Sequence, residues 1–399
     1  MSAEIERLQL ARIRAPAIVN AHSRARVGSI DALRGLVIVL MALDHVRDYF
    51  GAARFDPLDL TQTSVPLFLT RWITHFCAPT FVLLAGVSAY LISKRCTRGE
   101  LTRFLATRGV WLIILEVTVV NAAWTFNLDY EHGVFLQVIW AIGASMIVLA
   151  GLVHLPRPMI AVFAVLMIAG HNLLDGVAPE NFGEFAWAWS LLHVQSPIPM
   201  GFVAYPLIPW IGVMALGYVL GALYDLDPEH RCRQWVRLGV AALALFVLLR
   251  FTNAYGDPQP WSAQANAIRT LLSFLNVEKY PPSLLYLLLT LGSGMLALAA
   301  FENARGRFAE LVCTLGRVPL FFYVLHIALA HLAAGLVALA AGFGPSVLTN
   351  IFVFLPEGWG FDLPVVYLAW VLVLATLYPA CRWYAEVKQR RTDWWLSYL

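Results

Sequence analysis

The sequence is poor in charge: only 13% of its 399 residues are Asp, Glu, Lys or Arg, whereas 60% are hydrophobic. Soluble domains carry roughly 25% charged residues and about 45–50% apolar ones. A soluble chain of this length has too little interior to hide so much apolar surface. The composition therefore excludes a soluble domain, a disordered chain and a nucleic-acid-binding protein, and it predicts an integral membrane protein.

Several motifs are also absent. The five cysteines form no CxxC pair, so we expect neither disulfides nor a zinc site, and no metal cofactor. GxSxG, HExxH, Walker A and a GxGxxG followed by an acidic residue do not occur. Residues 1–28 lack the apolar core of a cleavable signal peptide. No internal repeat is visible, which weakens the case for a secondary transporter.

Apolar stretches dominate what is present. A helix needs about 20 mostly apolar residues to cross the hydrocarbon core. Ten stretches qualify, with ends accurate to a few residues: 33–50, 71–92, 104–124, 134–153, 158–174, 205–224, 236–251, 282–301, 318–341 and 363–384. Two shorter pieces, 185–194 and 347–355, are interpreted as interfacial or re-entrant segments. The predicted fold class is all-α, a polytopic membrane bundle of about ten transmembrane helices.

The positions of Lys and Arg predict the orientation of these helices. With a cytoplasmic N-terminus, 22 of the 28 Lys and Arg residues fall on the cytoplasmic side of the ten spans. Such a bias is typical of cytoplasmic loops. We therefore expect both termini to be cytoplasmic, with a basic N-terminal tail over 1–28, a transmembrane domain over 29–385 and a C-terminal tail over 386–399.

Ionisable residues inside the spans need an explanation, because each costs about 2.5–3.5 kcal/mol at mid-helix on insertion scales. The first span ends with Asp44, His45 and Asp48. A structural alternative is that Asp44 forms an ion pair with Arg47 at i+3. That pair explains poorly why Asp44 stands next to His45. A carboxylate near a shielded histidine is typical of acid–base catalysis, in which the imidazole deprotonates an attacking hydroxyl or amine.

Other spans carry polar groups to a similar depth. His75 and His171 lie near the outer ends of the second and fifth spans, and Asp44 could orient either of them. His326 lies nearer mid-membrane, where it could line a channel or simply bond a helix carbonyl. We predict His45 as the general base, Asp44 as the residue that sets its local charge, and His75 as the reserve candidate. Asp48, His171 and His326 are predicted to contact substrate.

Two arginines mark the predicted cytoplasmic surface. Asp31 in the first turn of the first helix can pair with Arg34 at i+3, which is a sufficient structural account of Asp31. Arg34 could instead bind a phosphate, together with Arg317, because the planar guanidinium bonds two oxygens at once.

Five motifs together resemble a known family of bacterial membrane proteins, grouped with the catalytic domain of heparan-α-glucosaminide N-acetyltransferase within the transmembrane acyltransferases. The resemblance runs in order from about residue 28 to 385. The motifs are Ser29-Ile-Asp-Ala-Leu-Arg-Gly35 followed by Asp44-His45, Ala78-Pro-Thr-Phe-Val-Leu-Leu-Ala-Gly86, Tyr205-Pro-Leu-Ile-Pro-Trp-Ile-Gly212, Lys279-Tyr-Pro-Pro-Ser283 and Gly316-Arg-Val-Pro-Leu-Phe-Phe-Tyr-Val-Leu-His326.

The resemblance implies a multi-pass acetyltransferase of the bacterial inner membrane. Acetyl-CoA would be the cytoplasmic co-substrate, and a sugar amine or hydroxyl on the other side would be the acceptor, with Lys279 among the substrate-binding residues. The eukaryotic members have an essential histidine in a loop that corresponds to 51–70, which has no histidine here. That role would then pass to His45 or His75. The expected partners are the lipid bilayer and a sugar or glycan, without nucleic acid, and a homodimer is left open.

A second interpretation from a different class is also open. The same buried Asp and His residues could form the proton relay of a coupled transporter. Net solute flux in proteoliposomes would distinguish the transporter from the enzyme.

The orientation can be tested with a reporter fused after Leu399. We expect a reporter that works only in the cytoplasm to be active there, because the alternating positive charges predict a cytoplasmic C-terminus. A reporter that is active only outside the cytoplasm would contradict the number of spans and the depth assigned to each polar residue.

Overall fold

The structure is a computed structural model that describes residues 28–127, 130, 133–349, 356–391, 393 and 396. The predicted N-terminal tail lies outside the described residues, except for Gly28, as do 350–355 of the second short apolar segment and most of the C-terminal tail after 391. Among the described residues, eight helices are long and apolar enough to cross a membrane. The chain is therefore a multi-pass, all-α membrane protein.

Helices form most of the described chain, and several of them join end to end. The helical elements are α3 (Gly28–Phe50), α4 (Val65–Trp72), η1 (Ile73–Phe76), α5 (Cys77–Ser93), α6 (Arg98–Leu115), η2 (Glu116–Val120), α7 (Asn121–Thr125), α8 (Val138–Leu152), α9 (Arg157–Gly170), η3 (His171–Leu174), η4 (Pro179–Phe185), α10 (Ala186–Leu192), α11 (Leu207–Leu220), η5 (Gly221–Asp225), α12 (Pro228–Thr252), α13 (Ala267–Leu275), α14 (Leu284–Phe301), α15 (Arg307–Gly316), α16 (Pro319–Ala340), η6 (Pro345–Leu348) and α17 (Leu363–Arg390).

Each of the ten predicted spans contains a helix, so the helical bundle is confirmed. Within the described residues, eight of the ten are long and apolar enough to cross a membrane, and α3 and α8 are not among these eight. The ends of two spans differ from the prediction. The second helix begins at Val65 and runs through η1 into α5. The fourth span is shorter than 134–153, because its first residues pair as a strand and α8 has only 15 residues, about 22 Å of helix. α17 continues to Arg390, beyond the predicted end of the transmembrane domain.

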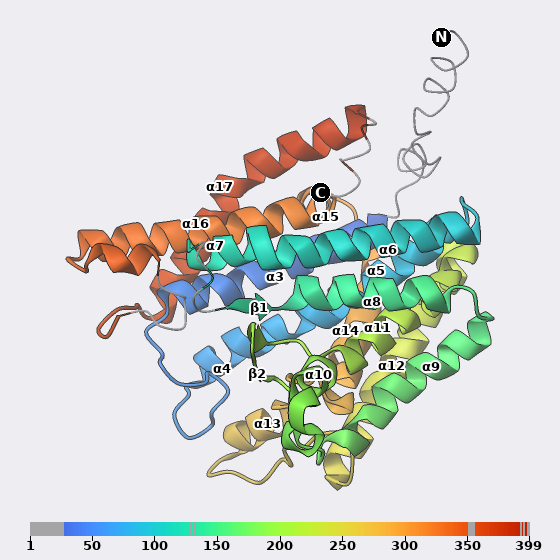
Figure 1. Cartoon of the computed structure of the whole chain (residues 1–399), viewed down its shortest axis with the longest axis horizontal. Coiled ribbons are helices and arrows are strands. Elements are labelled where there is room, and N and C mark those ends of the chain that lie inside the picture. Colours follow the sequence, from blue (N-terminus) through green and yellow to red (C-terminus); the bar gives the residue numbers. More distant parts are fainter. Residues whose placement is uncertain are drawn as a thin grey trace.

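A small three-stranded sheet causes the shortening of the fourth span. β1 (Val134–Leu136) pairs in parallel with β3 (Gly201–Val203), and β3 pairs in antiparallel fashion with β2 (Ser196–Ile198). β1 directly precedes α8, so this sheet lies at the start of that helix (Figure 1). The segment predicted to be interfacial over 185–194 contains α10, a helix of seven residues that packs against β2.

The helix α3 is the centre of the bundle, since it packs against α5, α14, α15, α16 and α17. Two glycines allow α15 to approach it closely. A Cβ at Gly35 would lie 1.7 Å from the carbonyl oxygen of Val312, and one at Gly316 would lie 1.9 Å from the carbonyl oxygen of Asp31. The two backbones are therefore in direct contact, which only glycine permits at these positions.

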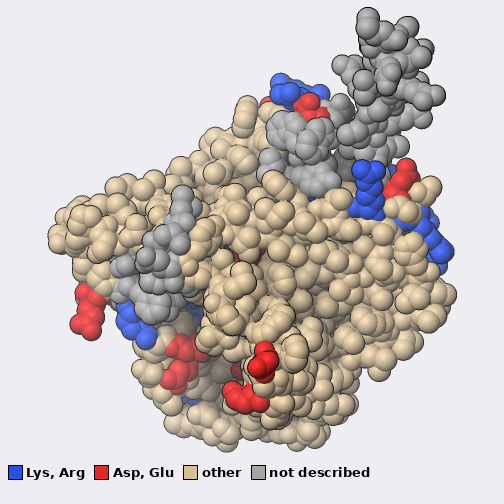
Figure 2. Space-filling view, viewed as in Figure 1, with Lys and Arg blue, Asp and Glu red and all other residues tan. Residues whose placement is uncertain are grey.

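The connections between the helices lie at two opposite ends of the bundle. We call the end formed by the α5–α6, α11–α12 and α14–α15 connections the basic end, and the opposite end, formed by the α3–α4 and α12–α14 connections, the distal end. In Figure 2 the surface is mostly free of Lys, Arg, Asp and Glu, and the charged side chains gather toward its edges and its lower part. A lipid-facing surface is expected to have this distribution.

Candidate functional site

The distal end of α3 carries a group of charged and imidazole side chains. Because α3 is surrounded by other helices, these side chains face protein rather than lipid. We define the distal cluster by its seven residues, which are Asp44, His45, Arg47, Asp48, Arg71, Lys279 and His326.

Two arginines hold the Asp44 carboxylate. Arg47 Nη2 lies 3.0 Å from Asp44 Oδ1, and Arg71 Nη1 lies 3.1 Å from Asp44 Oδ2. Arg47 also binds Asp48 at 2.5 Å. The i+3 pair that the sequence left open is thus present, and Asp44 orients an arginine rather than His75 or His171. An interior ion pair of this kind is costly to break, since either partner alone would be a buried, unpaired charge.

His45 forms a pair with His326 of α16. His45 Nδ1 lies 2.7 Å from His326 Nε2, and the two rings are stacked with their centroids 5.0 Å apart. His326 Nδ1 lies 3.0 Å from the carbonyl oxygen of Phe322, which can only accept. When both rings are neutral, His326 therefore donates from Nδ1 and accepts at Nε2, and His45 donates from Nδ1. The Nε2 atom of His45 then keeps a free lone pair.

A loop between α13 and α14 supplies the third cation. Lys279 is 7% exposed, its ammonium lies 4.9 Å from the ring centroid of Tyr280, and it acts electrostatically on Asp44 and His45. Burial alone would raise the pKa of Tyr280, but the cations of Lys279 and Arg71 outweigh it, so that pKa lies below its usual value. With three cations and two carboxylates, the distal cluster has a formal excess of one positive charge, which suits a developing anion.

His75 lies apart from the distal cluster's hydrogen bonds. It is 1% exposed, and neither ring nitrogen has a hydrogen-bond partner. Its backbone has a clear structural role. Pro79 has no N–H to bond the His75 carbonyl, and the hydroxyl of Tyr286 donates to that carbonyl instead, at 2.7 Å. The start of α5 is thus tied to α14.

Sequence reasoning did not identify Arg71 or Tyr280 as site residues. Arg71 lies four residues before His75 in one continuous helical segment, and an arginine inside such a segment needs a partner. Nothing in the spacing of Tyr280 indicates its neighbours, because the loop that contains it is placed by tertiary contacts.

The predicted phosphate-binding arginines meet at the basic end. Arg34 Nη1 lies 3.2 Å from Asp31 Oδ1, which confirms the i+3 pair, and it also donates to the carbonyl of Gly316. Arg317 Nε lies 3.9 Å from the other oxygen of Asp31. Both arginines are partly exposed, so one carboxylate holds two cationic groups at the surface of the bundle.

His171 lies at the distal end but on another pair of helices. It begins η3 after α9, is 2% exposed, and has its ring 5.6 Å from that of His193. Of the predicted site residues, the structure therefore joins His45, Asp44, Asp48 and His326 in one cluster with Lys279, places Arg34 with Arg317, and leaves His75 and His171 outside both groups.

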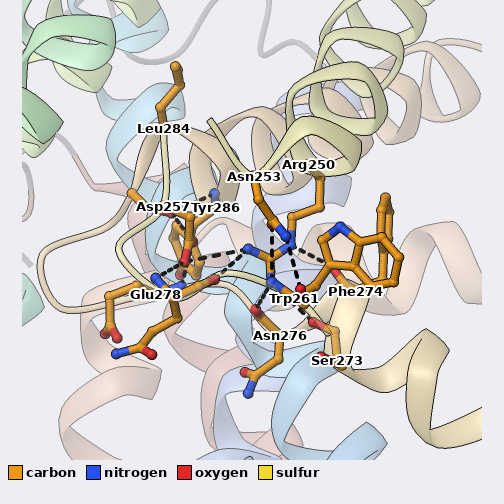
Figure 3. Close-up of polar contacts among 12 residues, drawn as sticks. Arg250, Asn253, Asp257, Trp261, Ser273, Phe274, Asn276, Glu278, Leu284 and Tyr286 are labelled. Atoms are coloured by element: carbon orange, nitrogen blue, oxygen red, sulfur yellow. Dashed lines mark hydrogen bonds and ion pairs between the residues drawn. The ribbon is translucent and has the colours of Figure 1, made fainter. Parts of the chain in front are cut away.

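Arg250 fixes the loop that contains Lys279 (Figure 3). Its side chain and that of Asp257 are each 1% exposed, and the two are 3.6 Å apart. Asp257 in turn accepts from the amide of Glu278 at 2.9 Å and from the Ser283 hydroxyl at 2.7 Å, on either side of Lys279. Arg250 also donates to backbone carbonyls of Gln259, Ser273, Phe274 and Asn276, at 2.5–3.0 Å.

Burial affects the acids of this loop. It raises the pKa of the Asp257 carboxyl above its usual range, although hydrogen bonds and Arg250 oppose the shift. It also raises the pKa of Glu278. Arg250 therefore offsets the burial of Asp257, whereas Glu278 accepts from the backbone amides of Lys279 and Tyr280.

These features define the chain as a membrane-embedded helix bundle with a cluster of ion pairs and a hydrogen-bonded histidine pair at one end, and an arginine pair at the other. Comparison with known protein families matches residues 26–251 to the catalytic family described as "Heparan-alpha-glucosaminide N-acetyltransferase, catalytic". The match covers more than half of the chain, so this protein belongs to that family, whose function is transmembrane acetyl transfer. The matched range includes Arg34, Asp44 and His45. Lys279, Arg317 and His326 lie beyond the end of that range. No curated protein sequence matches the chain.

Replacement of Arg250 should loosen the loop that contains Lys279 without replacing any residue of the distal cluster. We expect Arg250→Met to lower the free energy of unfolding by about 3–5 kcal/mol, because it leaves Asp257 buried without its cation. The measurements are the thermal unfolding midpoint and the rate of proteolysis within 253–283. Arg237→Met on the exposed side of the same helix is the control. Equal midpoints and cleavage rates in the two variants would contradict the role of Arg250.

Proposed function

We propose that this protein transfers an acetyl group from cytoplasmic acetyl-CoA to an amine or hydroxyl of a sugar on the other side of a bacterial inner membrane. The observation that carries the proposal is the His45–His326 hydrogen bond, which leaves His45 Nε2 as an acceptor beside an excess positive charge. A general base needs such a nitrogen, and an acyl-transfer intermediate needs the cation.

The proposed reaction uses the residues as follows. His45 Nε2 takes the proton of the acceptor N–H or O–H, and the acceptor atom bonds to the thioester carbonyl carbon. Lys279 stabilises the oxyanion that forms on the carbonyl oxygen. When the C–S bond breaks, the imidazolium of His45 returns its proton to the departing thiolate. Acetylated acceptor and CoA leave, and His45 is again neutral.

Several features support a donor site at the opposite end of α3. Arg34 and Arg317 share one carboxylate and are both partly exposed. Arg34 also donates to Gly316 and Ser88, so Arg317 is the arginine with more freedom to bind phosphate oxygens of CoA. Arg34 and His45 are eleven residues apart, just over three helical turns or about 16.5 Å, and so lie on nearly the same face of α3. In the proposal the donor extends along this face toward the distal cluster.

The base can be tested by substitution. We expect His45→Gln to lower kcat by about 10²–10⁴-fold, the usual contribution of a general base, with acetyl-CoA affinity retained. The assay measures transfer from labelled acetyl-CoA to a panel of amino sugars and neutral sugars. His230→Ala, at an exposed histidine bonded to Asp227, is the control.

His326→Gln is expected to lower kcat less than His45→Gln and to move the pH profile, because His326 only fixes the tautomer of His45. A loss below tenfold in His45→Gln would rule out His45 as the base. A large loss in His75→Ala alone would place the base on the second helix.

The donor site is tested at Arg317. We expect Arg317→Ala to weaken acetyl-CoA binding about tenfold or more, since a hydrogen bond to a charged group contributes roughly 1.5–3 kcal/mol. Calorimetry on the purified protein measures the affinity, and Arg305→Ala in the exposed connection before α15 serves as the matched control. Unchanged affinity in Arg317→Ala would mean that this arginine does not bind the donor and serves only as a positive charge that sets the membrane orientation.

A further inference from the structure

Three potential metal ligands meet at the distal end, outside the distal cluster. His171 begins η3, Asp175 follows it, and His193 follows α10. One ligand atom from each residue can be chosen so that all three lie within 4.8 Å of one another. His171 and Asp175 are four residues apart, but His193 comes from a different helix, so only the packing of α10 completes the group.

The ring of His171 has no adequate partner in this group. It is 2% exposed, and neither nitrogen makes a hydrogen bond of normal geometry, although the carbonyl of Pro282 is near enough to affect it. A buried polar group without a partner is costly and uncommon. The position of His171 beside two other potential ligands gives a specific reason for its burial.

Hydrogen bonds hold the other two residues close to His171. His193 Nε2 lies 3.7 Å from Asp175 Oδ1 and 2.7 Å from the carbonyl oxygen of His171. The second oxygen of Asp175 accepts from Asn172 Nδ2 at 2.8 Å. Carboxylate ligands of metals are usually held in this way by a neighbouring hydrogen bond.

We propose that His171, Asp175 and His193 form a binding site for one divalent transition metal ion, with Zn²⁺ as the best match. Two imidazoles and one carboxylate are a ligand set that zinc uses with a water molecule in the fourth position. Zinc–ligand bonds of about 2.0–2.2 Å in a tetrahedron separate neighbouring ligand atoms by about 3.3–3.6 Å. The observed 3.7 Å between His193 and Asp175 is close to that separation.

Binding requires a local rearrangement. The His193 ring must turn away from the His171 carbonyl, because Nε2 lies 2.7 Å from that oxygen and leaves no room for an ion about 2.0 Å away. The proton on Nε2 moves to Nδ1, so the number of bound protons does not change. The side chain of Asp175 is 25% exposed and can move toward His171 to close the remaining distance. The bound ion carries one net positive charge with its three ligands and remains accessible to solvent on the Asp175 side.

The site would join parts of the distal end that are far apart in the sequence. The ion would link the end of α9 to the end of α10. Asn172, which supports Asp175, also accepts from the amide of Leu284 at 2.9 Å, at the start of α14 and five residues after Lys279. A metal there would stabilise the distal loops. The inference departs from the sequence-based expectation of no metal and does not depend on acetyl transfer.

The experiment uses the full-length protein in detergent after removal of metals with a chelator. Titration with Zn²⁺, followed by calorimetry, is expected to show one ion per chain and a rise in the thermal midpoint, since a ligand that binds the folded state stabilises it. Titration with Co²⁺ should give the visible absorption of a tetrahedral nitrogen and oxygen site. Both signals should be lost in His171→Ala and retained in the control His230→Ala.

A variant that preserves shape covers the case in which His171→Ala does not fold. Asp175→Asn keeps the hydrogen-bonding outline of the partly exposed side chain and removes only its charge, so we expect zinc affinity to fall at least tenfold with a normal midpoint in the absence of metal. Zinc binding that is absent from the wild-type protein, or that is equal in Asp175→Asn, His171→Ala and the wild type, would overturn the proposal.

Discussion

The carboxylate of Asp44 lies between the guanidinium groups of Arg47 and Arg71, and the geometry of the distal end depends on this contact. Inside a membrane protein a charge must be balanced close by, because little solvent is available to screen it. The pairing joins the first two spans at a fixed depth. It also uses both oxygens of Asp44, which leaves His45 to take its hydrogen-bond partner from α16 instead.

α3 connects this distal cluster with the basic end. At that end Asp31 holds Arg34 and Arg317, and Gly35 and Gly316 let α15 touch α3 backbone to backbone. A bulkier residue at either glycine would move Arg317 away from Asp31. The same rigid helix thus fixes the distance between the proposed donor anchors and the proposed base, which is what acyl transfer across a membrane requires.

The distal loops are positioned by buried polar contacts rather than by helix packing. Arg250 and Asp257 fix the segment that presents Lys279, and Asn172 bonds the first turn of α14. Such groups give little net stability, because their desolvation is costly, but they allow few alternative arrangements. A site that must stabilise a transient negative charge benefits from cations that are already in place.

The sequence by itself determined the membrane bundle, since the length and hydropathy of the apolar stretches suffice to locate helices in lipid. It identified Asp44, His45, Arg34 and Arg317 as charged or polar residues that need an explanation. It also correctly offered the pairs Asp31–Arg34 and Asp44–Arg47, because i+3 neighbours on a helix are always close.

Only the tertiary structure decided which side chains from different helices meet. It paired His45 with His326, brought Arg71 and Lys279 to Asp44, and set His193 beside His171. It also shortened the fourth span by pairing Val134–Leu136 with Gly201–Val203. Helical periodicity gives the face and depth of a residue but not the identity of the opposing helix, which is set by close packing, buried charge pairs and loop contacts over long sequence separations.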